Sequence, residues 1–170
     1  MHFQNFALLS LATLAIAAPT PSKRGVLADT NFNAISIAGG RAGNAEAEAL
    51  AVFSALDLQN PQNIDQADLT FLNSVNQVAN QAEKQAFNPA VEAANGVQAD
   101  QIQNGKIKNK VLKLEATVIK LMAQQAQGQD VTERLAEETK KLNTNIGLDQ
   151  AAAGQVSIAM PFDGAISGSR

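Results

Sequence analysis

The chain has 170 residues, with 13 basic and 16 acidic side chains, and a net charge of −3. It contains no cysteine, tryptophan or tyrosine, and its one histidine is His2. The absence of cysteine excludes disulfides, thiol catalysis and cysteine-ligated metals. The acidic balance gives no general attraction to nucleic acid.

The first 24 residues have the pattern of an export leader. Residues 6–18 form an uncharged apolar run that is too short to span a bilayer and ends in small residues, Ala17 and Ala18. A buried helix of the fold is the alternative, but the run shows no polar face and prolines follow it. We therefore predict a signal peptide over residues 1–17 and a secreted, extracellular protein, with no transmembrane segment once the leader is removed.

A dibasic pair, Lys23-Arg24, follows the two prolines and directly precedes Gly25. We predict a pro-segment over residues 18–24, cleaved after Arg24 by a kexin-like protease. His2 is then lost with the leader, so histidine triads and histidine metal sites are also excluded. We expect a mature protein that is not an enzyme and needs no cofactor or metal.

The layout of a short apolar leader, the segment Ala-Pro-Thr-Pro-Ser-Lys-Arg and a small mature domain resembles that of small secreted proteins of filamentous fungi. The resemblance covers only the leader, and it is to a class of proteins with no specific family. It implies an extracellular protein and says nothing about the mature domain.

Residues 44–147 predict a mainly α fold, a bundle of about five helices, because apolar residues recur at steps of three and four. The first helix follows an Asn44 cap and ends before Pro61. The second follows Asp65 and carries a stripe from Leu69 to Ala86, and Asn88-Pro89 either ends it or starts the next helix. A third, weaker helix over residues 91–97 would contain Gly96.

A turn is predicted at Asn104-Gly105, between the third and fourth helices. The fourth helix would run from Ile107 to Gly128, with an apolar stripe widened by Met122. A capping box formed by Asp130 and Glu133 would start the fifth helix, and Gly147 would end it. Its inner face would carry Val131, Leu135, Leu142 and Ile146.

The two flanks of the bundle, residues 25–43 and 148–170, are predicted to be extended arms. Both contain the sequence Ser-Ile-Ala within an alternation of apolar and small polar residues. Two arrangements are open: the arms pair as a short sheet against the bundle, or they lie over it separately.

Five lysines give the fourth helix a locally basic stretch that is a candidate contact for an anionic partner. The alternative is an ordinary solvated helix face, with Lys113 on the outside. No arginine or aromatic residue is interleaved, so base stacking is not expected. The lysines are Lys106, Lys108, Lys110, Lys113 and Lys120.

The apolar stripes are candidates either for a solid core or for the lining of a cavity that holds a fatty acid. A helical bundle with such a cavity resembles, in architecture, the ligand-binding helical bundles of fungal cell-wall mannoproteins and of hydrophobic-surface-binding proteins. No diagnostic motif of either is present, so that resemblance assigns no residues. The candidate lining residues are Leu72, Val75, Val111, Leu114, Val118 and Leu135.

These patterns predict a small, non-enzymatic protein that acts outside the cell by binding. The candidate partners are components of the cell wall, of a host or of a substrate surface, which includes an effector-like role. The alternative is a carrier of an apolar ligand.

Overall fold

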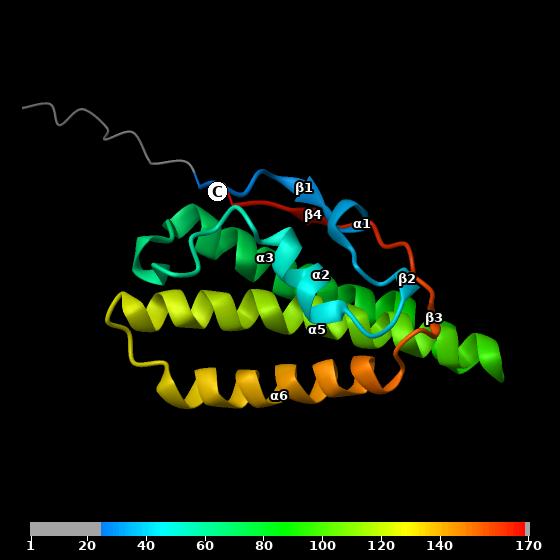
Figure 1. Ribbon diagram of the computed structural model, residues 1–170. Coiled ribbons are helices and arrows are strands. Elements are labelled where there is room, and N and C mark those ends of the chain that lie inside the picture. The colour runs from blue at the N-terminus through cyan, green and yellow to red at the C-terminus, as the bar shows by residue number, and fades with distance from the viewer. Residues whose placement is uncertain (1–24, 169–170) are drawn as a thin grey trace, which may run out of the picture.

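The computed structural model describes residues 25–168. As predicted, this part of the chain is mainly helical, with short strands at its flanks (Figure 1). The predicted signal peptide and pro-segment lie outside the described residues.

Helix α5 (Val97–Ala126) is the central element. It lies between α3 (Gln66–Ala82) and α6 (Thr132–Ala151), as Figure 1 shows, and makes its largest contacts with these two helices. The predicted stripe on α5 is buried from Ile107 to Leu121, because its steps of three and four place it on one side of the helix. Met122, which was predicted to widen the stripe, is 42% exposed.

The predicted turn at Asn104-Gly105 is wrong, since α5 runs through both residues. Position 105 is glycine because the C-terminal arm crosses the helix closely there: a Cβ would overlap the carbonyl oxygen of Ile158. Asn104 donates from Nδ2 to the carbonyl of Val156 at 3.0 Å. Gly105 therefore leaves room for the C-terminal arm where it crosses α5, and Asn104 binds the arm there.

Helix α3 continues without a break into a π-helix, η2 (Glu83–Phe87), and then into α4 (Asn88–Ala93). Pro89 lies in the first turn of α4, where its missing N–H leaves no partner for a carbonyl one turn earlier. The wider π-turn accommodates that missing bond. The predicted third helix exists as α4, but its predicted extent is wrong: α4 ends at Ala93, and Gly96 is the N-cap of α5 with φ of +56°.

Helix α2 (Ala45–Val52) crosses α5 and is followed by the 3-10 helix η1 (Pro61–Asn63). Asn44 occupies the predicted N-cap position, but its side chain makes no cap hydrogen bond. The buried face of α2 is made by Ala45 and Ala49, whereas Phe53 and Leu56 are buried beyond its end.

Both predicted ends of α6 are wrong. The helix has Val131 at its N-cap with no side-chain cap bond, so the capping box does not form. At the other end it passes Gly147 and continues to Ala151. A Cβ built on Gly147 meets no atom within 4 Å, so no other segment approaches this glycine closely.

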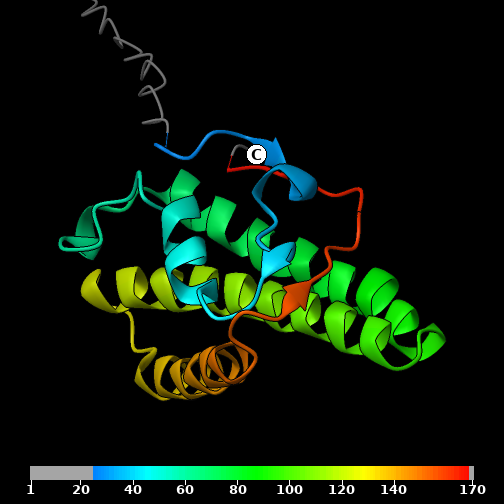
Figure 2. The same ribbon diagram turned by 45° about the vertical axis from the view of Figure 1, so that its right-hand side comes forward.

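The two arms pair with each other, which settles the alternative left open by the sequence. Strand β1 (Thr30–Asn31) is antiparallel to β4 (Ala165–Ile166), and β2 (Gly40–Arg41) is antiparallel to β3 (Val156–Ser157). The short helix α1 (Phe32–Ile35) follows β1. Figure 2 shows the arms side by side over the bundle, on the opposite side of α5 from α6.

The arms are held by packing as well as by strand bonds. The buried Phe32 ring meets the edge of Phe162 with centroids 6.1 Å apart. The Phe32 N–H donates to the carbonyl of Gly164 at 2.8 Å, and Ile166 is completely buried.

Candidate functional site

Lys108 is the most deeply buried of the five candidate lysines, at 1% exposed. Its ammonium donates to the carbonyl oxygens of Gly39 at 2.8 Å and Arg41 at 3.1 Å. It also forms an ion pair with Glu48 of α2 at 2.8 Å. Lys108 thus joins the N-terminal arm, α2 and α5, and its charge is balanced within the fold.

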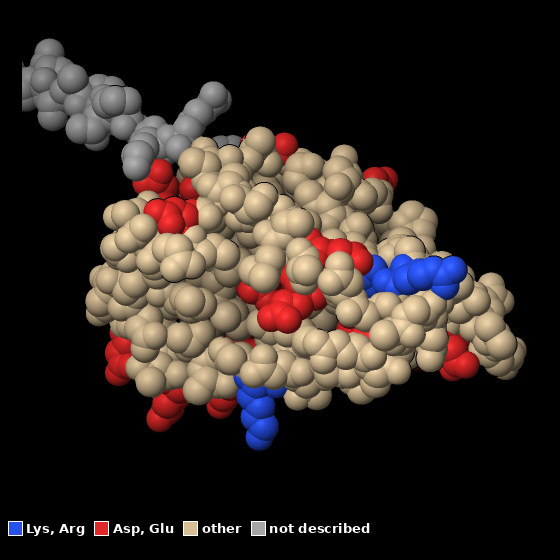
Figure 3. Space-filling view, viewed as in Figure 1, with Lys and Arg blue, Asp and Glu red and all other residues tan. Residues whose placement is uncertain are grey.

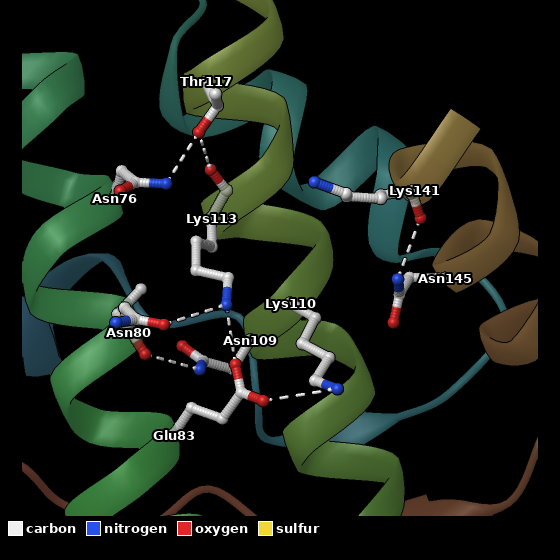
Figure 4. A network of polar contacts seen from close by, with 10 residues as sticks. Asn76, Asn80, Glu83, Asn109, Lys110, Lys113, Thr117, Lys141 and Asn145 are labelled. Atoms are coloured by element: carbon white, nitrogen blue, oxygen red, sulfur yellow. Dashed lines mark hydrogen bonds and ion pairs between the residues drawn. The ribbon is translucent and has the colours of Figure 1, made fainter. Parts of the chain in front are cut away.

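Lys110 and Lys113 both pair with Glu83, the first residue of the π-helix (Figure 4). The distances are 3.2 Å from Lys110 and 2.7 Å from Lys113, which also donates to Oδ1 of Asn80. Burial tends to raise the pKa of Glu83, but the hydrogen bond and charge of Lys113, aided by Lys110, lower it overall. Lys113 was predicted on the outer face; the structure places it half-buried between α5 and α3.

The last two lysines are also half-buried. Lys120 donates to Oδ1 of Asn73 at 2.9 Å. Burial lowers the pKa of Lys120, and the positive charge of Arg134 lowers it further. Lys106 lies one turn before Lys110 on α5. Four of the five lysines are therefore engaged by groups of this chain, with which an anionic partner would have to compete.

The contact between α3 and α5 also contains uncharged polar side chains that no sequence motif marks (Figure 4). Asn76 donates to Oγ1 of Thr117 at 2.7 Å, and buried Asn109 donates to the carbonyl of Ala79 at 3.0 Å. The sequence gives one sign of these contacts: Asn109 and Thr117 are polar residues that lie within the span of the apolar stripe of α5. Such polar bonds fix one register between two helices, because a shift would leave buried groups unpaired.

Glu115 of α5 is a buried carboxyl group, 7% exposed. Burial raises its pKa to about 7, and the negative charge of Glu46 on α2 contributes in the same direction. The sequence showed Glu115 only as an acidic residue among lysines. The structure makes it a group that titrates near neutral pH.

Asp149 of α6 caps the start of α2. Its Oδ2 accepts a hydrogen bond from the Ala45 N–H at 2.8 Å, which replaces the side-chain cap that Asn44 does not make. Its Oδ1 is buried without a hydrogen-bond partner among the described residues. A pocket of about 80 Å³ adjoins it, formed by the start of α2 with Ile146 and Gln150. That space suffices for a small hydrogen-bond donor.

The sequence comparisons identify the family. The family model described as a domain of unknown function, DUF8454, matches residues 27–161. The chain belongs to this family. No curated protein and no solved structure matches it.

The matched range of the DUF8454 family includes both arms up to β3 and all the helices of the bundle. Within residues 25–168, no three side chains of the metal-binding types gather into a group that could hold a metal ion. No helix in this range has the length and apolar character to cross a membrane.

The six candidate ligand-lining residues of this DUF8454 domain belong to its packed interior. Leu72, Val75 and Val111 are completely buried, Leu114 and Val118 are nearly so, and Leu135 packs against them partly buried. The pocket beside Asp149 lies elsewhere, at the junction of α2 and α6. The candidate processing residues Ala17, Ala18, Lys23 and Arg24 lie outside the described residues.

Proposed function

We propose that the protein is a small secreted, non-enzymatic binding protein that acts outside the cell on a component of the cell wall, of a host or of a substrate surface. The leader pattern of the first 24 residues supports export. The mature domain then meets its partner as a preformed helical scaffold.

One structural observation carries the binding proposal: the buried and half-buried charged side chains Lys108, Glu83 and Asp149 hold elements of this fold together. Lys108 joins the N-terminal arm and α2 to α5, and Glu83 joins the π-helix η2 to α5. Asp149 joins α6 to α2. Side chains that make such structural contacts are poorly placed to act in catalysis. Binding by the exposed side chains is then the function that we propose.

The exposed surface is mostly uncharged on the face shown in Figure 3, with scattered acidic groups and few basic ones. A surface of this kind recognises a partner by hydrogen bonds and shape, without a strong long-range field. Helix α6 contributes exposed polar residues to this surface, since only Leu142, Ile146 and Asp149 of that helix are buried.

Co-sedimentation of the secreted protein with insoluble cell-wall material tests the proposal. We expect the folded protein to enter the pellet and to remain in solution when it is unfolded by urea beforehand. Hydrogen exchange of the bound form should then show protection at exposed backbone positions. Retention of the protein inside the producing cells, or no binding to wall and host surfaces, would contradict the proposal.

Native mass spectrometry of the same preparation tests the carrier alternative. Because the candidate lining residues pack against one another, we expect the mass of the bare polypeptide. A co-purifying fatty acid, together with a melting temperature that rises with fatty-acid concentration, would instead support a carrier.

A further inference from the structure

Asp68 is a buried carboxylate in the first turn of α3, 2% exposed, and it holds the start of the described chain. Its Oδ2 accepts from the Val26 N–H at 3.1 Å, and its Oδ1 accepts from the Leu27 N–H at 2.9 Å. Leu27 also packs against the core. The first residues of the predicted mature domain are therefore fixed to the bundle by one side chain.

Gly25 lies against the same carboxylate. A Cβ on Gly25 would overlap Oδ1 of Asp68 and would lie 2.8 Å from its Cγ. The Gly25 Cα, which would carry that Cβ, therefore lies beside the carboxylate. The Gly25 nitrogen is bonded directly to this Cα. Gly25 is also the residue that directly follows the Lys23-Arg24 pair.

We propose that cleavage after Arg24 creates an α-ammonium group on Gly25 that binds the Asp68 carboxylate, so that maturation itself stabilises the fold. The endoprotease adds one water across the peptide bond between Arg24 and Gly25. Arg24 leaves with a carboxylate, and the Gly25 nitrogen takes up a proton to become the ammonium. A neutral amide with one N–H is thereby replaced by a cation with three.

The surroundings of Asp68 suit this role. A carboxylate has about four acceptor positions, and two are used by Val26 and Leu27, so an ammonium can be added without losing either bond. Burial strengthens the resulting charge-assisted bond.

The test compares the melting temperatures of three forms of the same protein. One begins at Gly25, one begins at Ala18 and keeps Lys23-Arg24 uncut, and one begins at Gly25 with an acetylated amino group. We expect the free Gly25 form to melt at least about 3 °C above the other two. Equal melting of the free and acetylated Gly25 forms would overturn the proposal, and this comparison needs no substitution.

Two matched variants locate the effect. Asp68→Asn should abolish the difference between the free and acetylated forms. Asp149→Asn changes another 2%-exposed carboxylate that accepts a backbone N–H, so it should lower the melting temperature of both forms and preserve their difference. A difference that persists in Asp68→Asn would refute the assignment to Asp68. These outcomes are independent of wall binding, so the proposed function can fail while this inference holds.

Discussion

Helices α3 and α6 lie against the same central helix, but α5 engages them in different ways. Of the 17 residues of α3, eight are buried, among them Phe71, Leu72 and Val75. Of the 20 residues of α6, three are buried. The Glu83–Lys113 pair joins η2, which continues α3, to α5, whereas the Lys141–Glu138 pair of α6 lies within that helix. Stability should therefore reside mainly between α3 and α5, and α6 should tolerate change.

Truncation of a leucine on each helix gives the largest expected contrast. Leu72→Ala removes a completely buried side chain of α3 and should lower the free energy of unfolding by about 2–5 kcal/mol. Leu148→Ala on α6 is the control, because Leu148 is 49% exposed, and should change it by less than about 0.5 kcal/mol. Urea unfolding measures both. Equal losses would mean that α6 is as integral to the core as α3.

The buried carboxyl group of Glu115 on α5 predicts that the free energy of unfolding depends on pH. The pKa of Glu115 is about 7 in the folded protein against an ordinary 4.5. Between these values the folded state binds more protons than the unfolded state, so stability falls as pH rises from about 4.5 to about 7. Glu115→Gln removes this fall and should be more stable than the native protein by about 2–3 kcal/mol at pH 8.

Urea unfolding between pH 4 and pH 8 checks the effect of Glu115. Glu133→Gln, at the exposed start of α6, is the matched control, and the pH slope of its stability should stay that of the native protein. If Glu115→Gln keeps the native slope as well, another group is responsible for it.

Substitution of two helical glycines by alanine should change the free energy of unfolding in opposite directions. Gly105→Ala in α5 places a Cβ against the Ile158 carbonyl and 3.1 Å from that of Ala38, and should cost about 1–3 kcal/mol. Gly147→Ala in α6 meets no atom within 4 Å and should gain about 0.5–1 kcal/mol, because alanine favours a helix interior. Thermal unfolding of the two variants should shift in opposite directions. A gain in both would show that the arm does not press on α5.

The smallest expected contrast is between a lysine of α5 that pairs with Glu83 and an exposed lysine of α6. Lys113→Ala leaves half-buried Glu83 with Lys110 alone and should cost about 1–2 kcal/mol. Lys140→Ala, on the exposed face of α6, should change the free energy of unfolding by less than about 0.5 kcal/mol. If the two substitutions cost the same, the Glu83 pair contributes nothing measurable.

The sequence by itself determined the helical class and the apolar stripes of α3 and α5. The stripes on α3 and α5 were predictable because a helix of 3.6 residues per turn puts residues three and four apart on one face. The Asn44 and Asp65 cap positions were predictable because each precedes a run of helix-forming residues. The glycine and capping signals failed at Gly105, Gly147 and Asp130, where local preference was the only guide.

Only the tertiary structure decided what those local signals mean. Gly105 looks like a turn residue in sequence, but it is the point where a distant segment, near Ile158, crosses a continuous helix. Lys113 looks like a surface charge, but its partner Glu83 is 30 residues away. Lys108, Asp149 and Asp68 share this property, because each finds its partners on other elements. Periodicity reports which face of a helix is apolar, whereas a polar side chain is assigned its role by whichever segment packs against it.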